Sequence, residues 1–306
     1  MGLGAGVPVR VAAIDQGTNT TRLLVADIED GAARELHRET RITRLGEGVD
    51  TRGRLLPVPI ARVRNALSDY RRTAESLGAE RTLLIATSAV RDAENGEAFL
   101  GEIEWSYGFA TQLLSGDDEA ELTRRGLGAI AAGTLLVDIG GGSTELVLDD
   151  FRASLPLGSV RFTERHGEKI SALEAATHAL LPPLEPAEAV GVAGTITTLA
   201  ALDLGLERYD RERVHGHFLT RYGARAQLDR LVALPLEERR NVPAPAPERA
   251  PVIVAGAAIL VTILETYALD GIRASERDIL DGAALAAAEL PEPEEGAAPP
   301  GAYTCC

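Results

Sequence analysis

Short apolar runs separated by glycine-bearing polar turns recur along the chain, and their order predicts an α/β protein. Residues 9–14 and 22–28 are apolar runs flanking a glycine-bearing turn, and we expect them to form a hairpin that residues 35–45 extend as a third strand. Residues 59–77 carry apolar side chains at helical spacing, with a proline near the start and Gly78 after the end. Further short strands are expected over residues 82–86 and 111–114, each followed by a helix start.

The second half of the chain begins in the same way. Residues 134–137, a glycine turn, residues 144–148 and residues 153–155 repeat the three-strand opening. Residues 189–193 and 252–255 predict buried strands that break into helices at glycine. We therefore expect two similar α/β domains, residues 1–126 and 127–290, linked near residues 124–133, with a disordered tail over residues 291–306.

One sequence pattern occurs twice, at residues 14–27 (IDQGTNTTRLLVAD) and 137–149 (VDIGGGSTELVLD). The copies superpose Asp15 on Asp138, Gly17 on Gly140, Thr20 on Ser143, Thr21 on Thr144 and Leu23 on Leu146. Each copy predicts a hairpin whose turn presents backbone N–H groups beside a carboxylate, and two such hairpins facing each other would grip a phosphate chain. Arg22 in the first copy stands where the second copy has Glu145, which suggests a metal on the second side only.

Three successive glycines and a serine, residues 140–143, are the strongest candidate for phosphate binding. Glycines let backbone amides converge on an anion, and Ser143 adds a hydroxyl donor, although a glycine-rich hairpin without a ligand is the plain alternative. Ligands in open α/β sheets gather beyond the carboxyl ends of the strands. The expected phosphate-binding residues are Asp15, Gly17, Thr18, Asn19, Thr20, Arg22, Arg91, Gly140, Gly141, Gly142, Ser143, Gly194 and Thr195.

Asp138 and Glu145 are hard oxygen ligands of the kind that Mg²⁺ takes, one or two at a time, beside substrate phosphate. The alternative is that Asp138 caps its own turn and Glu145 faces solvent. Asp15 could add a water-mediated contact to the metal, or it could form a purely structural Asx-turn.

Residues 115–119 (SGDDE) place three carboxylates, Asp117, Asp118 and Glu119, at a predicted helix start. Such a cluster is typical of a capped, solvated helix end. Near a bound phosphate, one of these carboxylates could instead orient and deprotonate a water for in-line attack. The spacing alone leaves open which one does so.

Arg91 follows a predicted strand and stands at an expected helix start, where the helix dipole disfavours its charge. We interpret it either as a phosphate ligand or as a partner of the acidic loop at Asp117, and Arg22 has similar alternatives. His215 and His217 alternate on what we interpret as a strand edge, and without nearby carboxylates or cysteines they are not expected to bind a metal.

The formal net charge of -15 argues against a broad nucleic-acid or anionic-membrane surface, so a polyanionic ligand would have to be held locally. The apolar runs are too short to cross a bilayer and no leader pattern is visible, which predicts a soluble cytoplasmic protein. The two cysteines, Cys305 and Cys306, predict no disulfide framework; a prenylation signal is the alternative use of such a terminus.

Taken together, these segments resemble the Ppx/GppA phosphatases, the exopolyphosphatase and guanosine-pentaphosphate phosphohydrolase family. The matching segments are 13–19 (AIDQGTN), 45–48 (LGEG), 86–91 (ATSAVR), 115–120 (SGDDEA), 138–147 (DIGGGSTELV), 157–161 (LGSVR), 192–195 (VAGT) and 249–256 (RAPVIVAG). The resemblance implies two actin-like (ribonuclease H-like) domains facing each other across an active-site cleft, Mg²⁺-dependent (or Mn²⁺-dependent) release of orthophosphate from polyphosphate, and a homodimer. It implies Glu119 as the water-activating base, Asp138 and Glu145 as metal-side carboxylates, and Arg91 in the phosphate path.

Two departures from the family pattern stand out. Longer members carry extra C-terminal helical domains, which residues 1–306 lack, so short polyphosphate chains are the expected substrate, as in the short actinobacterial members that the chain resembles. Gln16 stands where a small or apolar residue is common. Hydrolysis of the 5′-phosphate of guanosine pentaphosphate is the alternative activity; an ATP-dependent kinase and a non-catalytic polyphosphate or nucleotide sensor are the more distant ones.

Overall fold

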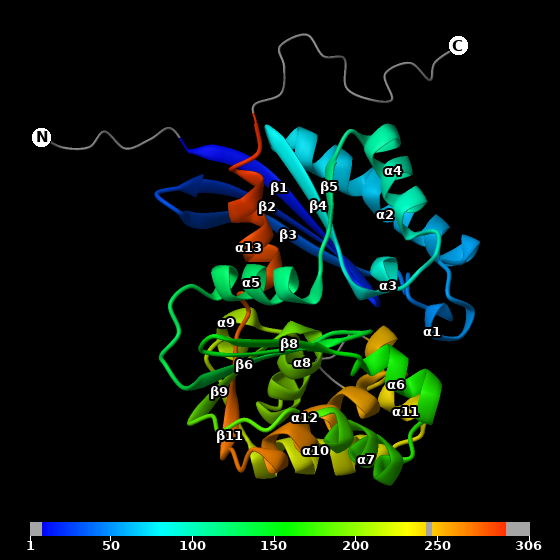
Figure 1. Cartoon of the computed structure of the whole chain (residues 1–306), viewed down its shortest axis with the longest axis vertical. Helices are drawn as coiled ribbons and strands as arrows, with labels where there is room; N and C mark the ends of the chain where they lie inside the picture. The colour runs from blue at the N-terminus through cyan, green and yellow to red at the C-terminus, as the bar shows by residue number, and fades with distance from the viewer. Residues whose placement is uncertain (1–7, 243–246, 292–306) are drawn as a thin grey trace, which may run out of the picture. The chain divides into compact units, whose positions relative to one another are not determined.

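The computed structural model describes residues 8–242 and 247–291, which form two compact units (Figure 1). The first unit contains the chain up to Gly126 together with the segment that begins at Ile279, and the second unit runs from Leu127 to Asp278. None of the helices in the described ranges combines the length and the apolar character that spanning a membrane requires.

A five-stranded mixed sheet forms the centre of the first unit, in the order β3-β2-β1-β4-β5. The first three strands make an antiparallel meander, and β4 and β5 continue the sheet in parallel from β1. The strands are β1 (Val9–Gln16), β2 (Thr20–Glu29), β3 (Ala32–Ile42), β4 (Arg81–Ala86) and β5 (Ala110–Leu113). The predicted first hairpin and its third strand are confirmed, as are the two parallel strands.

Both faces of this sheet are covered by helices. Successive side chains of β1 point to opposite sides of the sheet, so alternate residues meet different helices. Ala12 and Ile14 pack with the apolar faces of α2 (Pro57–Ser76) and α4 (Gly96–Tyr107). Val11 and Ala13 pack with α13 (Ile279–Ala287), which lies on the sheet in Figure 1. The remaining helices of this unit are α1 (Val49–Arg52), α3 (Ser88–Arg91) and α5 (Gly116–Leu127).

The place of α13 corrects the predicted domain boundary at residue 290. Leu280, Ala283 and Ala287 are fully buried in the core of the first unit, so burial of this apolar face binds α13 there. The helix also approaches α5 closely, since a Cβ added at Gly282 would lie 1.9 Å from the Leu122 carbonyl oxygen. The predicted tail, including Cys305 and Cys306, lies outside the described residues apart from residue 291.

The second unit repeats the strand order of the first. Its sheet runs β10-β11-β9-β6-β7-β8, in which β8, β7, β6, β9 and β11 take the places of β3, β2, β1, β4 and β5, and β10 is an added edge strand. The strands are β6 (Thr134–Ile139), β7 (Thr144–Leu148), β8 (Phe151–Leu155), β9 (Glu188–Val192), β10 (Phe218–Thr220) and β11 (Gly271–Ala274). The predicted α/β class with two units of similar topology is confirmed.

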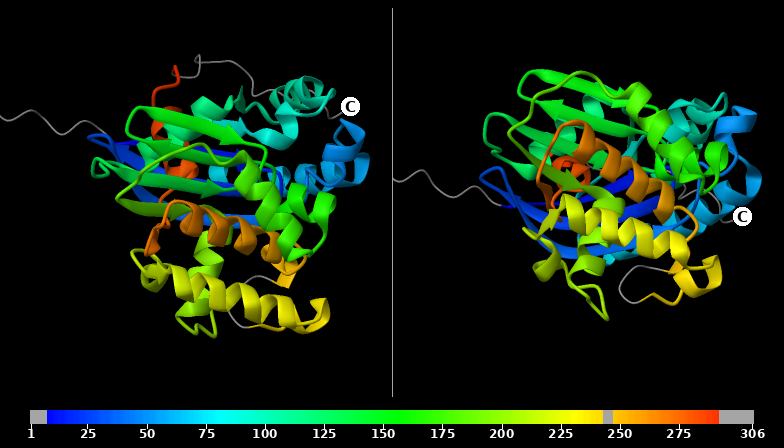
Figure 2. Two further views of the ribbon diagram at one scale, coloured as in Figure 1. Left: turned by 60° about the horizontal axis from the view of Figure 1, so that its bottom comes forward. Right: turned by 90° about the horizontal axis from the view of Figure 1, so that it is seen from below.

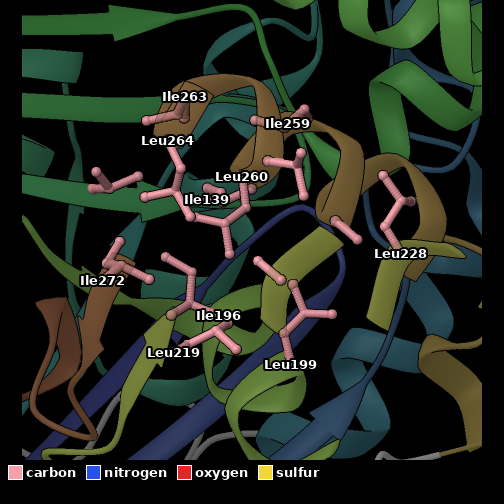
Figure 3. Close-up of a cluster of buried hydrophobic side chains, with 14 of the residues drawn as sticks. Ile139, Ile196, Leu199, Leu219, Leu228, Ile259, Leu260, Ile263, Leu264 and Ile272 are labelled. Carbon is pink, nitrogen blue, oxygen red and sulfur yellow. The ribbon is translucent and has the colours of Figure 1, made fainter. Parts of the chain in front are cut away.

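The core of the second unit is organised around a buried helix, α12 (Ile253–Thr266), which packs beside α10 (Arg221–Ala233) (Figures 2 and 3). We predicted a strand over residues 252–255, and this is wrong. Every residue of α12 from Ile253 to Leu264 is buried, so the segment shows no polar face that would reveal the helical period. The other helices here are α6 (Ser159–His166), α7 (Ile170–Leu180), α8 (Ala193–Asp203), α9 (Arg211–Val214), α11 (Leu236–Arg239) and the 3₁₀ turn η1 (Pro247–Arg249).

Candidate active-site residues in the two units

The two hairpins place their charged residues at the same register position. In the β1–β2 pair Asp15 lies directly opposite Arg22, and in the β6–β7 pair Asp138 lies directly opposite Glu145. Side chains that are opposite each other in an antiparallel pair point to the same face of the sheet and interact. The two sequence copies therefore differ at one register position, which holds opposite charges in the first hairpin and like charges in the second.

In the first unit the pair is an ion pair. Arg22 Nε donates to Asp15 Oδ2 at 2.8 Å, and Arg22 Nη2 lies 2.7 Å from the same oxygen. Asp15 is buried and Arg22 is nearly so. The guanidinium thus balances the buried carboxylate, while contacts from Asp15 to a metal and from Arg22 to phosphate stay predictions.

In the second unit the two carboxylates share one buried site. Asp138 is 8% exposed and Glu145 is 3% exposed, so the alternative in which Glu145 faces solvent is wrong. Ser154, opposite Glu145 on β8, donates its hydroxyl to Glu145 Oε1 at 2.7 Å. Like charges directly opposite each other are destabilising in a sheet, and a bound cation would reverse the sign of that interaction.

The turn between β6 and β7 is held by the start of α6. The backbone N–H of Ser159 donates to the Gly140 carbonyl at 3.0 Å, and that of Val160 donates to the Gly141 carbonyl at 2.8 Å. Arg161 Nε completes the set by donating to the Gly142 carbonyl at 2.7 Å.

These contacts fix the direction of the turn's amides. Within a trans peptide the carbonyl and the next residue's N–H point in opposite directions. Because the carbonyls of residues 140–142 point to α6, the N–H groups of Gly141, Gly142 and Ser143 point away from it. No acceptor in the described part of the chain takes a hydrogen bond from these three N–H groups, which leaves a row of donors suited to an anion.

The turn of the first hairpin has the same character. Its carbonyls accept from the loop that follows β3: Gly46 N–H donates to the Thr18 carbonyl at 2.8 Å, and Arg44 N–H donates to the Asn19 carbonyl at 3.0 Å. The hydroxyls of Thr18 and Ser88 lie 2.9 Å apart, which ties the turn to the start of α3. Gln16, the unexpected residue, is fully buried and donates from Nε2 to the Gly17 carbonyl at 3.0 Å.

Glu119 is the buried member of the acidic cluster at the start of α5. Its residue is 5% exposed, whereas Asp117 and Asp118 are exposed. Arg91 forms an ion pair with Glu119 Oε1 and donates to the Leu114 carbonyl at 2.8 Å through the same nitrogen, Nη1. Arg91 thus contacts the acidic segment, as one of its two predicted alternatives required.

Asp118 has a different role, because it forms the helix cap together with Ser115. The N–H and hydroxyl of Ser115 donate to Asp118 Oδ2 at 3.0 and 2.6 Å, and Asp118 N–H donates back to the Ser115 hydroxyl at 3.2 Å. This is a reciprocal capping arrangement. The hydrogen bonds from the Ser115 hydroxyl and N–H hold the pKa of the Asp118 carboxyl below its usual value.

Two sequence interpretations of polar residues are corrected by the structure. Arg91 is the last residue of the single-turn helix α3 and does not begin a helix, so the expected conflict with a helix dipole does not arise. His217 precedes β10, and its Nε2 lies 2.8 Å from Asp203 Oδ2, so it does have a nearby carboxylate. Sequence separation of 14 residues concealed this partner.

Gly194 and Thr195 lie in the first turn of α8, which begins at Ala193 directly after β9. The Arg249 guanidinium packs over Gly194, where an added Cβ would lie 1.9 Å from Nη1. Thr195 is buried and packs against Gly256 of α12, where a Cβ would lie 2.8 Å from the Thr195 hydroxyl. Arg249 is not among the residues predicted for the site, and the signal that could have found it is its position in a segment that matches the family.

Each unit gathers its candidates at the carboxyl ends of neighbouring strands. In the first unit β1, β4 and β5 end in register, which brings the Asp15 hairpin, α3 and the start of α5 to one sheet edge. In the second unit β6 and β9 end in register, which brings the glycine turn and the start of α8 together. The predicted cleft between the units stays a prediction, as does a shared site.

Comparison with known proteins identifies the family to which the chain belongs. The model of the Ppx/GppA phosphatase family matches residues 24–288. The chain is 40% identical to Exopolyphosphatase 2 of Mycobacterium tuberculosis, over 91% of this chain and 98% of that protein. It is 29% identical to a guanosine-5′-triphosphate,3′-diphosphate pyrophosphatase of Vibrio vulnificus, over 92% of this chain and 59% of that protein. The crystal structure of the Aquifex aeolicus Ppx/GppA family member superposes with a TM-score of 0.74 at 31% identity, covering 92% of this chain and 97% of that one. The chain therefore belongs to the Ppx/GppA phosphatase family.

Proposed function

We propose that this protein is an exopolyphosphatase, which hydrolyses the terminal phosphoanhydride bond of inorganic polyphosphate and releases orthophosphate. The observation that carries the proposal is the full-length similarity to an exopolyphosphatase, combined with a buried carboxylate, Glu119, held by Arg91 in a matching family segment. Short chains are the proposed substrate, and comparing tripolyphosphate with long polyphosphate tests this length preference.

Glu119 is the proposed general base. Its carboxylate would take a proton from a water molecule whose oxygen attacks the terminal phosphorus, while the bond from that phosphorus to the bridging oxygen breaks. The products are orthophosphate and a chain shorter by one phosphate. Arg91 holds the Glu119 carboxylate in place before substrate arrives, and such positioning is central to phosphoryl transfer.

The two hairpin turns are the proposed phosphate ligands. The N–H groups of Gly141, Gly142 and Ser143 point away from α6, and the Asn19 N–H points away from the loop after β3, because the carbonyls on the opposite side of those peptides are held. Preorganised N–H donors stabilise the charge that shifts between phosphoryl oxygens during transfer.

The carboxylates of Asp138 and Glu145 fit Mg²⁺, with Mn²⁺ as the alternative. They are hard oxygen donors that lie directly opposite each other on neighbouring strands. The described residues hold no group of three or more His, Cys, Asp or Glu side chains that could bind a metal ion, so these two carboxylates would be the protein's ligands. Mg²⁺ commonly takes one or two carboxylates and fills its other positions with water and substrate phosphate. A bound divalent cation would neutralise negative charge on the phosphoryl oxygens.

Guanosine pentaphosphate is the second candidate substrate, and the similarity to the Vibrio vulnificus pyrophosphatase favours it. That similarity covers 59% of the relative, whereas the exopolyphosphatase is matched over 98% of its length. Both activities would use the same base and the same phosphate-binding turns. We also propose a homodimer acting in the cytoplasm; light scattering after size-exclusion chromatography measures the mass.

A substrate panel tests the proposal. Orthophosphate release is measured from tripolyphosphate, from long polyphosphate and from guanosine pentaphosphate, each with Mg²⁺ and with EDTA. The proposal expects Mg²⁺-dependent release, with the highest kcat/KM on inorganic chains. Faster hydrolysis of the nucleotide would establish the second candidate, and binding of all three without release would overturn hydrolysis altogether.

A further inference from the structure

The first unit contains a groove that is lined by none of the candidate active-site residues described above. It has a volume of about 590 Å³ and lies where the segment entering α2 meets the start of α4. Its lining is Arg54, Leu55, Leu56, Pro57, Ile60, Arg64 and Asn95. None of these residues belongs to the hairpin turns, to α3 or to α5, so the proposed hydrolysis leaves the groove unused.

The wall of the groove is preformed. Asn95 accepts from the Leu55 N–H at 2.8 Å through Oδ1 and donates to the Leu55 carbonyl at 3.1 Å through Nδ2. The Glu94 N–H donates to the Gly53 carbonyl at 2.8 Å. This pairing pins the extended segment before α2 to the start of α4, so a ligand would find the shape already in place.

The charge of the groove is positive, although the chain carries a net charge of -15. Arg54 is exposed, and no carboxylate of the described chain pairs with it. Arg64 is held by Glu102, which accepts from its Nε and Nη2, both at 2.7 Å, so Nη1 is not used in that pair. The lining contains no carboxylate, which favours an anionic ligand.

The floor of the groove restricts the kind of anion. Leu55, Leu56, Pro57 and Ile60 are apolar, and an inorganic polyphosphate has no apolar surface to bury against them. The volume falls in the range of small-molecule sites, roughly 300–1,000 Å³. A flat organic group with a phosphate at one end satisfies both the arginines and the apolar floor.

We propose that this groove binds a nucleoside phosphate, with the phosphate on Arg54 and Arg64 and the base on the apolar floor. The site is separate from the one proposed for polyphosphate hydrolysis. It would therefore remain available when polyphosphate occupies the hairpin turns.

Calorimetric titration of the full chain tests this proposal. GDP and ADP are titrated in EDTA, which suppresses hydrolysis, with tripolyphosphate present in excess to occupy the hairpin turns. Arg54→Glu is compared with Arg52→Glu, which makes the same charge change at a neighbouring exposed arginine outside the groove. Thermal midpoints check that both variants fold.

We expect one nucleotide to bind per chain despite tripolyphosphate, and Arg54→Glu to weaken Kd at least about tenfold while Arg52→Glu changes it less than about twofold. Orthophosphate release from tripolyphosphate should be the same in both variants. Absence of nucleotide binding under these conditions, or equal weakening by the two substitutions, would overturn the proposal. Displacement of the nucleotide by tripolyphosphate would also overturn it, because the groove would then be an extension of the polyphosphate site.

Discussion

Glu145 lies directly opposite Asp138 in the β6–β7 hairpin, at the register position where Arg22 lies opposite Asp15 in the β1–β2 hairpin. One position of a repeated hairpin thus carries an ion pair in the first unit and a pair of buried carboxylates in the second. The first pair joins opposite charges, whereas the second places two like charges on one face of the sheet, where a bound cation would be stabilising.

Replacing Glu145 by Arg gives the second hairpin the same Asp–Arg pair that the first hairpin has. We expect Glu145→Arg to fold with a thermal midpoint at least equal to that of the parent in EDTA, because the arginine can pair with Asp138 as Arg22 pairs with Asp15. The parent should gain stability from millimolar Mg²⁺ and the variant should not. Calorimetric scans with and without Mg²⁺ measure both effects, and orthophosphate release should fall at least about 100-fold.

The matched control is Glu185→Arg, which makes the same charge change at an exposed position. It should respond to Mg²⁺ as the parent does. If Glu145→Arg kept the full Mg²⁺ response, Glu145 would have no part in metal binding.

Arg91 is expected to act by positioning Glu119. Arg91→Lys keeps the positive charge, but a single ammonium group reproduces poorly the guanidinium contact with both the Glu119 carboxylate and the Leu114 carbonyl. We expect kcat to fall about tenfold with a smaller change in KM, measured by steady-state release from tripolyphosphate. Arg125→Lys, which alters an exposed ion pair with Glu289, is the control. A fall confined to KM would assign Arg91 to substrate binding instead.

Asp118 should contribute to stability and not to catalysis. Asp118→Ala removes the reciprocal half of the capping box and leaves the N-cap residue Ser115 in place, which we expect to cost up to about 1 kcal/mol. Orthophosphate release per folded molecule should be unchanged. Because the pKa of Asp118 is lowered in the folded protein, its contribution is fully present above the unfolded pKa, near 3.9. It is lost as the pH falls through the lower folded pKa. Urea unfolding at pH 7 and at pH 3 should show a difference between parent and variant that shrinks at the acidic pH; a constant difference would contradict the charged cap.

Gly158 is expected to be indispensable for the shape of the glycine turn. A Cβ at this position would lie 2.3 Å from the Gly141 carbonyl oxygen and 2.5 Å from the Gly142 carbonyl carbon, both backbone atoms. Gly158→Ala should therefore shift the turn, lower kcat/KM at least about tenfold and lower the thermal midpoint. Gly101→Ala on α4 is the control, since nothing lies within 4 Å of an added Cβ there, and it should leave activity unchanged. Full activity in Gly158→Ala would show that the position of the turn is not critical.

The repeated hairpin and the parallel strands were predictable because their signals are local. The apolar runs around Asp15 and Asp138 alternate with glycine turns, so strand, turn and register follow from neighbouring residues. The helix α12 was mistaken for a strand because burial on all sides removes the polar face that shows helical periodicity. The place of α13 depends on the first sheet leaving one face uncovered, which no local pattern records.

In the candidate site, too, local features could be predicted from the sequence and long-range contacts could not. Spacing indicated the acidic start of α5 but left Asp117, Asp118 and Glu119 equivalent. Burial and the contact with Arg91, 28 residues away, distinguish Glu119 from the other two. Long-range partners of this kind are set by packing, and a single sequence contains no direct record of them.

Orthophosphate release from tripolyphosphate by Glu119→Gln in the presence of Mg²⁺, measured beside that of Asp117→Asn, decides whether Glu119 is the general base. Gln keeps the size of the side chain and removes its ability to accept a proton from water. We predict that Glu119→Gln folds with a thermal midpoint close to that of the parent and releases phosphate at least about 100-fold more slowly, while Asp117→Asn retains the parent rate. Unchanged turnover in the folded Glu119→Gln variant would contradict the account and remove Glu119 from the reaction.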